Sequence, residues 1–424
     1  MLIRQALPLC TGASRLPSAM PARASAMAMA APAVGTTSLP AGATFAAELQ
    51  AATKAVRLAS HLCQTVQQQL STSEKADKAD DSPVTVADYA AQAVVAWSLS
   101  QCPAAAPGGV LSMVAEEDSA SLRGAEGAAM LQRITRLINT VLTSSEVAGA
   151  QALNVPLTPQ QVLELIDMGA SPGGPTGRHW VLDPIDGTRG FVGMRQYSVC
   201  LGMLQQGVVE LGVLGCPNLP QGDVAEDAGG DLAMSRAGQQ GVGSLFLAHR
   251  GCGAFTAPLY GGDDQLRDLQ QVMVRDYEPG SMGAARFMES FESRHSDHTF
   301  TAAVAEEAGV APQALRMDSQ VKYGLLSRGA AAVFMRFPPP TYKEKIWDHC
   351  AGFVIVEEAG GCVTDAGGHR LDFSRGRFLQ LDRGIIAAPP KVHKELLRAV
   401  QVVQDSRNIA TASAGTDTDA VTVR

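Results

Sequence analysis

The chain has 424 residues, of which 46% are hydrophobic and 18% are charged, and its formal net charge is −8. This composition predicts a soluble protein with a large core, in one two-part domain or in two domains. An acidic chain excludes tight binding to a nucleic acid polymer through many phosphates. No apolar run reaches the roughly 18 residues of a membrane span, so the sequence predicts none.

The first 44 residues have the composition of an organelle transit peptide. They contain Arg4, Arg15 and Arg23 among many Ala, Ser and Pro residues, and the first acidic residue of the chain is Glu48. Segments that contain Arg and Ser but few acids are typical of transit peptides. We therefore expect residues 1–44 to direct the protein to an organelle, a chloroplast rather than a mitochondrion. The alternative is a disordered Ala-rich tail.

Two helices are predicted at the start of the folded region. Apolar residues recur at three- and four-residue steps over 45–70, which predicts an amphipathic helix. A second helix is expected to begin at a capping box of Thr85 and Asp88 and to end near Ser100. The elements expected next are a strand over 110–115, one or two helices over 122–147, a Gly/Pro-rich loop over 169–177 and a strand over 180–182.

The second half of the chain is predicted to contain hairpins and then alternating strands and helices. The hairpins pair 196–204 with 208–216, ended by 217–220, and 244–248 with 250–255. The later elements are a helix over 301–308, strands over 315–317 and 331–337, a helix over 346–359, strands over 362–364 and 384–388, and a helix over 391–403.

Two carboxylates three residues apart follow the strand at 180–182. Pro184 lies between Asp183 and Asp186 and fixes its own φ, and Gly187 permits a turn that most residues resist. Carboxylates and a bent backbone at a strand end can face one point, and hard cations such as Mg²⁺ prefer these oxygen ligands. The alternative is an Asp-rich turn that caps a helix.

Acidic residues occur at three more notable positions. Together with the pair of Asp183 and Asp186, we call them the four acidic stations. Asp88 lies near a predicted helix start, Glu116 and Glu117 follow a predicted strand, and Asp348 lies in the first turn of a predicted buried helix. Each has a structural alternative, because acids favour helix N-termini and solvated turns. The functional hypothesis is that all of them face one cleft.

In this order, the acidic stations resemble the Mg²⁺-dependent, lithium-sensitive phosphatase superfamily that includes inositol monophosphatase and fructose-1,6-bisphosphatase. Within it, the chain is similar to the 3′(2′),5′-bisphosphate nucleotidases over roughly residues 45–400. The segments that carry this similarity are 82–85, 114–119, 183–191, 216–220, 289–292 with His295, 318–324 and 346–349.

The resemblance implies an α/β (α+β) fold, a layered α-β-α-β-α sandwich. It also implies a division of the chain. The parts are 45–220 with most metal ligands, a flexible insertion over 221–243, 244–404 with the nucleotide contacts, and a disordered tail over 405–424.

The resemblance further implies about two or three Mg²⁺ ions per site. Their ligands would be Glu116, Asp183, Asp186, Asp348 and the carbonyl of Ile185. Glu117 is expected to contact these ligands or to bind metal weakly.

The implied catalytic pair is Thr188 and Asp88. The Thr188 hydroxyl would take the proton of the attacking water, and Asp88 would hold that hydroxyl in place. The residues implied for the substrate are Thr188, His295, Ser319, Lys322, Arg336 and Asp348. A Ser donor, a Lys charge and an Arg fork suit a phosphate and a purine ribose.

Three functions remain open from the sequence. The first is a nucleotidase for the small-molecule substrate 3′-phosphoadenosine 5′-phosphate and its sulfated form. The second is an inositol (poly)phosphate 1-phosphatase, because the metal site is shared. The third is a non-catalytic nucleotide-binding regulator, which the complete set of acids disfavours. Cys200 and Cys216 on neighbouring predicted strands also allow a redox role, although plain buried thiols are the simpler interpretation.

Overall fold

The computed structural model describes residues 36–40, 42–72, 83–144, 155–222, 224, 241–261, 266–291, 296–311 and 313–416. Residues 1–35 of the expected transit segment therefore lie outside the described residues. Most of the expected insertion, 223 and 225–240, lies outside them as well.

The larger of the two sheets is formed by strands that lie between Thr36 and Val272 in the sequence. Among the described residues it has eight strands in the order β1-β8-β7-β6-β5-β4-β3-β2. The neighbours pair antiparallel except β2 and β3, which run parallel. The strands are β1 Thr36–Thr37, β2 Met113–Ala115, β3 Arg178–Asp186, β4 Ser198–Gln205, β5 Val208–Pro220, β6 Val242–His249, β7 Gly253–Pro258 and β8 Leu269–Val272.

The smaller sheet belongs to the later part of the chain. Within the described residues its five strands follow the order β10-β9-β11-β13-β12, and β13 runs antiparallel to both of its neighbours. The strands are β9 Phe287–Glu289, β10 Leu315–Arg316, β11 Val333–Arg336, β12 Cys362–Asp365 and β13 Ile385–Ala388.

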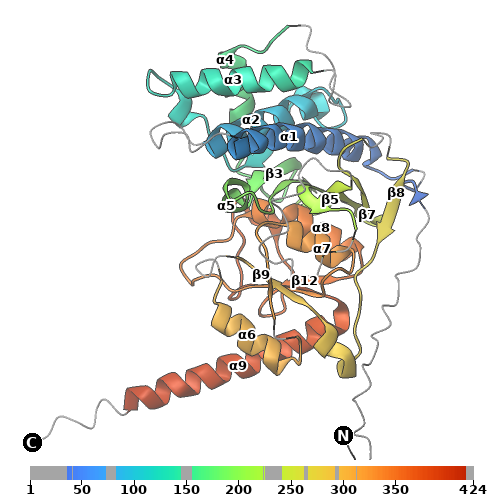
Figure 1. Cartoon of the computed structure of the whole chain (residues 1–424), viewed down its shortest axis with the longest axis vertical. Coiled ribbons are helices and arrows are strands. Elements are labelled where there is room, and N and C mark those ends of the chain that lie inside the picture. Colours follow the sequence, from blue (N-terminus) through green and yellow to red (C-terminus); the bar gives the residue numbers. More distant parts are fainter. Residues whose placement is uncertain are drawn as a thin grey trace, which may run out of the picture. The chain divides into compact units, whose positions relative to one another are not determined.

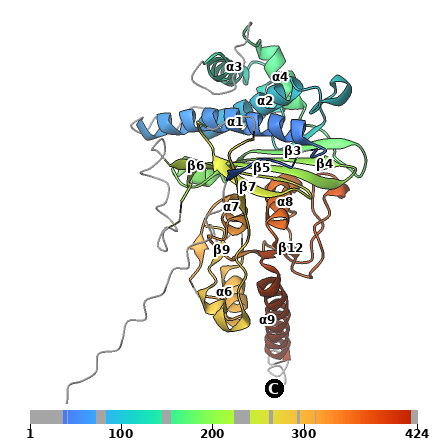
Figure 2. The ribbon, with the colours of Figure 1, turned by 90° about the vertical axis from the view of Figure 1, so that its right-hand side faces the viewer.

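Helices cover both sheets and separate them (Figures 1 and 2). The helices are α1 Ala46–Thr72, α2 Pro83–Ser100, α3 Ala128–Thr143, α4 Pro159–Asp167, α5 Thr188–Val192, α6 His298–Glu307, α7 Val321–Ser327, α8 Cys350–Glu358 and α9 Pro390–Thr416. Short 3₁₀ turns are η1 Pro107–Gly109, η2 Ala120–Leu122, η3 Pro279–Ala284, η5 Ile346–Asp348 and η6 Phe373–Arg375. No helix among the described residues combines the length and the apolar character needed to cross a membrane.

The order of the layers follows from the contacts. Helices α1 and α2 pack on one face of the larger sheet, and α8 packs on its other face. Helices α7 and α8 then lie between the two sheets, and α6 and α9 cover the far face of the smaller sheet (Figure 2). This arrangement confirms the expected α-β-α-β-α sandwich.

Burial explains why two of these helices are mostly apolar and have no polar face. Helix α2 lies between the larger sheet and helices α3 and α4, and all its residues from Val86 to Leu99 are buried. Helix α8 lies between the sheets and is buried from Cys350 to Val356. A helix covered on every side has no solvent face to make polar.

Several predicted boundaries are wrong. Helix α2 begins at Pro83, so Thr85 and Asp88 lie inside the helix and form no capping box. Proline suits the first helical position because its missing N–H would have no intrahelical partner there. Strand β5 does not stop at Cys216 but continues to Pro220, where a register shift lets it pair with Val242 of β6.

The helix expected over 346–359 is divided into η5 and α8, which places Asp348 in the 3₁₀ turn before the helix. At the other end, α9 continues past Val403 to Thr416, so residues 405–416 of the expected disordered tail are helical. Residues 417–424 lie outside the described residues.

The expected division at 221–243 does not coincide with the sheets. Strands β6, β7 and β8 follow that segment in sequence and yet extend the larger sheet beyond β5. The smaller sheet begins only at Phe287. Contacts join Thr36–Arg424 into one unit, so the two sheets are layers of the same unit.

One close approach fixes the distance between α7 and α8. Gly352 of α8 lies directly against the ring of Tyr323 in α7, and a Cβ at position 352 would fall well inside van der Waals distance of that ring. The Tyr323 side chain is fully buried. Only glycine lets the two helices come this close.

We expect Gly352→Ala to lower the free energy of unfolding by about 1–3 kcal/mol, because an added methyl group overpacks a buried ring. Urea denaturation measures this. Gly280→Ala is the control, since a Cβ there meets no atom within 4 Å, and it should change stability by less than about 0.5 kcal/mol. Equal effects of the two substitutions would show that the contact is not tight.

Candidate active site

A bulge in β3 places two carboxylates on one side of the sheet. In an uninterrupted strand, residues three apart point to opposite faces. Here Asp183 pairs with Cys200 and Asp186 pairs with Ser198, so β3 has one residue more than β4 between these pairs. Such a bulge turns the later side chain back to the same side. Pro184, which has no N–H to donate, is tolerated at a bulge.

The parallel pairing of β2 with β3 brings in a third carboxylate. Ala115 pairs with Leu182, so Glu116 leaves β2 beside Asp183. The fourth carboxylate is Asp348, at the end of η5, which contacts β3 and β4. Three of the four acidic stations thus meet although they are far apart in sequence.

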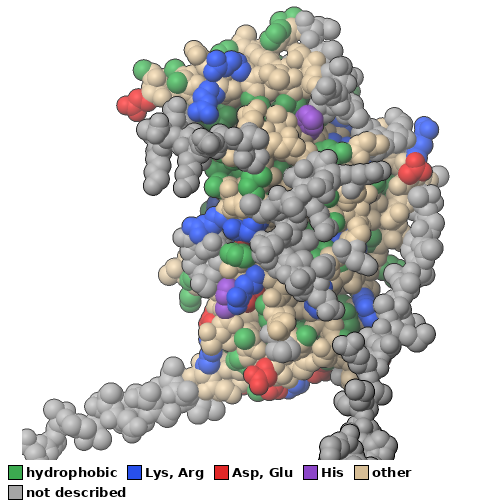
Figure 3. Space-filling model, in the orientation of Figure 1, with side chains coloured by type: hydrophobic (Ala, Val, Ile, Leu, Met, Phe, Trp, Pro, Cys, Tyr) green, Lys and Arg blue, Asp and Glu red, His purple; other side chains and the backbone are tan. Residues whose placement is uncertain are grey.

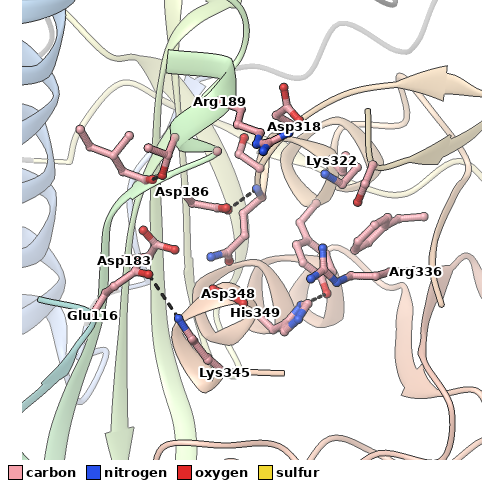
Figure 4. A pocket seen from close by; sticks show the side chains of 18 of the residues that line it. Glu116, Asp183, Asp186, Arg189, Asp318, Lys322, Arg336, Lys345, Asp348 and His349 are labelled. Atoms are coloured by element: carbon pink, nitrogen blue, oxygen red, sulfur yellow. Dashed lines mark hydrogen bonds and ion pairs between the residues drawn. The ribbon is translucent and has the colours of Figure 1, made fainter. Parts of the chain in front are cut away.

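These carboxylates line one side of a cavity of about 330 Å³ (Figure 4). We call this side the acidic wall, and its residues are Glu116, Asp183, Asp186 and Asp348. Lys322 and Arg336 also line the cavity and lie across it from Glu116 and Asp183 in Figure 4, and we call them the basic wall. Ile185, Thr188 and Ser319 also line the cavity, so most of the predicted site residues are brought together.

The acidic wall is electrostatically unfavourable by itself. Burial raises the pKa of Asp183 well above its usual value, and Glu116, Asp186 and Asp348 raise it further. Burial also raises the pKa of Asp186 to about 6, although Lys322 and the backbone N–H of Gln320 oppose the shift. The pKa of Asp348 is raised by burial, and then by Glu344 and Asp186. Positive charge in this wall would reverse these shifts.

The donors of the acidic wall fit a hard divalent cation. Oδ1 of Asp183 is buried and has no hydrogen-bond partner among the described residues, and a buried polar atom without a partner is costly. Ile185 lines the same cavity, and the resemblance assigns its carbonyl oxygen to the set. A set made only of carboxylate and carbonyl oxygens is what Mg²⁺ prefers.

Asp88 and Glu117 lie behind the acidic wall rather than in the cavity lining. Asp88 is buried in α2, and burial followed by Glu117 and Glu116 raises its pKa. Burial and then Glu116 raise the pKa of Glu117 to about 7. Gln92 of α2 holds the backbone of Glu117 through both its N–H and its carbonyl, at 3.1 and 2.8 Å.

The Thr188 hydroxyl has a different partner from the expected one. It donates to the carbonyl of Ile185 at 3.4 Å, and among the described residues no hydrogen bond joins it to Asp88. Thr188 begins α5, which contacts α1 and α2. The catalytic pairing of Thr188 with Asp88 therefore stays a prediction.

The basic wall is held in place from behind. Lys322 is buried and donates to the carbonyl of Met317 at 2.9 Å. Burial lowers the pKa of Lys322 to about 8, although Asp186 and Asp318 oppose the shift. Arg336 donates to Glu344 at 2.5 Å, and this buried partner keeps the guanidinium charged and raises its pKa despite burial.

A chain of buried hydrogen bonds extends from Arg336. Glu344 also contacts Nε2 of His349 at 3.1 Å, and Nδ1 of His349 contacts the Tyr323 hydroxyl at 2.9 Å. Glu344, Asp348 and His349 lie close enough together to hold a metal ion. However, Glu344 and His349 are already satisfied by these protein partners, so we interpret the group as support for Arg336 rather than as a metal site.

The segment before α7 is strained and well anchored. Ser319 has a φ of 69°, a left-handed conformation that is uncommon for a residue other than glycine. Gln320 fixes it: its N–H donates to Asp186 at 2.5 Å, and its side chain bonds the carbonyl of Trp347 and the N–H of Gly352. Asp318 forms an ion pair with Arg195 at 3.1 Å.

Several residues of the site were missed in the sequence. Arg189, Gln320 and Lys345 line the cavity, and Glu344 orients Arg336. Arg189 and Gln320 lie inside predicted motifs, and Lys345 and Glu344 directly precede one, which was the available signal, but the sequence does not show which of these side chains face the cavity. His295, predicted to bind substrate, lies outside the described residues.

The two cysteines noted in the sequence are buried free thiols on β4 and β5. The Cys200 thiol donates weakly to Asp186 at 3.8 Å, and burial raises the pKa of both Cys200 and Cys216. A thiol that resists ionisation reacts slowly, which favours the interpretation of plain buried thiols.

Known proteins resemble this chain over most of its length. The sequence profile of the inositol monophosphatase family matches residues 44–405. A 3′(2′),5′-bisphosphate nucleotidase of Oryza sativa is 46% identical over 371 residues, which cover 87% of this chain and 98% of the relative. The 3′(2′),5′-bisphosphate nucleotidase 1 of Arabidopsis thaliana is 46% identical over 354 residues, covering 84% and 95%.

A solved structure agrees in fold. An inositol monophosphatase from Zymomonas mobilis superposes with a TM-score of 0.50 at 16% identity, and the match covers 84% of this chain and 99% of that chain. The sequence match and the carboxylates gathered at the bulge of β3 lead to one conclusion: the chain belongs to the inositol monophosphatase family.

Proposed function

We propose that this protein is a Mg²⁺-dependent 3′(2′),5′-bisphosphate nucleotidase. It removes the 3′-phosphate of 3′-phosphoadenosine 5′-phosphate to give AMP, and that of the sulfated form to give adenosine 5′-phosphosulfate. The relatives with this name match 84–87% of the chain at 46% identity.

The observation that carries the proposal is a cavity with two walls of opposite charge. The acidic wall can hold cations that bind the phosphate to be cleaved, and Lys322 and Arg336 face it with positive charge for a second anionic group. A substrate with two separate phosphates matches this arrangement, whereas a monophosphate bound at the acidic wall would supply no anion to Lys322 and Arg336.

The acidic wall and the carbonyl of Ile185 would hold about two or three Mg²⁺ ions. When bound, Mg²⁺ would neutralise the phosphate oxygens and make an attacking water more acidic at neutral pH. Glu117, whose backbone is fixed by Gln92, would support Glu116 from behind.

The protein itself supplies position and a path for the proton. The Thr188 hydroxyl would accept a hydrogen bond from the attacking water and take its proton. It would pass its own proton to Asp88, which is buried in α2. This requires the hydroxyl to leave the Ile185 carbonyl, a weak contact at 3.4 Å. Positioning of this kind is the main contribution that phosphoryl transfer needs from a protein.

The substrate would lie along the basic wall. The guanidinium of Arg336 keeps its outer nitrogens for a ligand, because Glu344 is bound through Nε. Lys322 supplies a point charge beside it, and Ser319 a hydroxyl. By family resemblance, His295 and Asp348 would complete the contacts to the nucleotide.

The charge pattern on the face drawn in Figure 3 gives no support for the binding of a nucleic acid polymer. On the face drawn in Figure 3, the described Lys and Arg side chains are dispersed and form no continuous band. A polymer that binds through many phosphates needs such a band.

The central test compares phosphate release from equal concentrations of 3′-phosphoadenosine 5′-phosphate and inositol 1-phosphate with Mg²⁺. We expect release from the nucleotide to be faster by at least about tenfold, because only this substrate engages both walls. EDTA should abolish the release, and millimolar lithium should inhibit it. Preference for inositol 1-phosphate would favour the inositol phosphatase alternative, and no release from either would favour a non-catalytic regulator.

Asp183→Asn should lower phosphate release by at least about 10²–10³-fold, because it removes a buried charge that the cations need. It should also raise the melting temperature of EDTA-treated protein. The pKa of Asp183 is raised in the fold, so its ionised form opposes folding at neutral pH. Asp382→Asn is the control: this half-exposed carboxylate pairs with Arg383 and should affect neither measurement. Near-normal turnover of Asp183→Asn would contradict the metal assignment.

The proposal includes an organelle location, a chloroplast rather than a mitochondrion. Residues 1–44 fused to a fluorescent protein should enter chloroplasts of leaf protoplasts, because the segment is basic and contains no acidic residue. The same segment with Arg4, Arg15 and Arg23 changed to Glu should stay in the cytosol. Import into mitochondria, or no import, would contradict this part of the proposal.

A further inference from the structure

A lysine side chain reaches into the acidic wall. Lys345 precedes η5, is about one-third exposed, and places its Nζ 3.3 Å from Oε1 of Glu116 (Figure 4). The two residues are 229 positions apart in sequence. Their contact joins the end of β2 to the turn that carries Asp348.

The ammonium faces more than one carboxylate. Its Nζ contacts Glu116, and Asp183 and Asp348 line the same cavity as Lys345. These are three of the four carboxylates of the acidic wall. Lys345 is therefore a cation of the protein itself in the place where the proposed function puts Mg²⁺.

The surroundings of Lys345 fix its backbone and leave its end adjustable. Its backbone forms a bridge to Phe378, and its Nζ lies 5.2 Å from the ring centre of Trp347. Arg377 lies over the same ring and donates to the carbonyl of Ala115, so it holds the strand end without using a carboxylate. The lysine side chain is a flexible stem of four carbons, so its ammonium can move without any change in the backbone.

We propose that Lys345 is an internal counter-ion that competes with divalent metal for Glu116, so that it sets the Mg²⁺ concentration at which the site loads. This inference rests on the proposed Mg²⁺ site. Two cations on one carboxylate repel each other strongly at this range. The singly charged ammonium on its flexible stem gives way, and its release from Glu116 opposes metal binding.

The test is a calorimetric titration of Mg²⁺ into EDTA-treated and dialysed whole protein, without substrate. Lys345→Met should bind Mg²⁺ about tenfold more tightly than the wild type, and Lys345→Gln should behave alike. Lys345→Arg keeps the charge and should stay within about threefold of the wild type. Lys343→Met is the matched control: it removes the same charge from an exposed neighbour and should change the affinity by less than about twofold.

The outcomes separate the inference from the proposed function. If the wild type binds Mg²⁺ but Lys345→Met binds it no more tightly than Lys343→Met, the inference is wrong and the proposed function stands. Weaker binding by Lys345→Met also overturns the inference, because the lysine would then support the site. If the wild type binds no Mg²⁺, both the inference and the proposed metal site fail.

Discussion

Repulsion among buried carboxylates is the constraint on which the site depends. One extra residue in β3 turns Asp186 to the side of Asp183, and the parallel neighbour β2 delivers Glu116 to the same edge. Such a group is stable only near compensating positive charge. The rest of the fold supplies it from the opposite direction, since Lys322 and Arg336 belong to the layers on the far side of the cavity. The two halves of the sandwich therefore need each other electrostatically as well as through packing.

The basic wall depends on buried hydrogen bonds that no sequence motif predicts. Glu344 and His349 connect Arg336 to Tyr323, and the Tyr323 ring packs against Gly352 of α8. The orientation of the guanidinium is thus tied to the spacing of two helices. Gln320 adds a second tie, because it bonds both Asp186 and the turn that precedes α8. Rigid support from the surroundings is what holds a site of this kind in a productive geometry.

Much of this could be predicted from sequence, and the failures have physical causes. Periodicity located most helices and strands, because it is a local signal, although several of their ends were misplaced. Three of the four acidic stations line one cavity, as the hypothesis of a shared cleft expects. The membership of β6 to β8 in the larger sheet was missed, since strand pairing is decided by tertiary contacts. Glu344 and Lys345 belong to no predicted motif, and only partners from other elements, such as Arg336 and Glu116, give them a role.

Ser319 carries a conflict between stability and function at a single position. Its left-handed backbone costs a residue with a side chain about 1–2 kcal/mol, so glycine would be the more stable choice there. The serine, however, lines the cavity where a substrate would bind, and its hydroxyl accepts a hydrogen bond from the N–H of Val321 at 3.2 Å. A selection for higher folding stability alone would favour glycine at position 319, and the hydroxyl would be lost. Stability and activity screens should therefore diverge first at this residue.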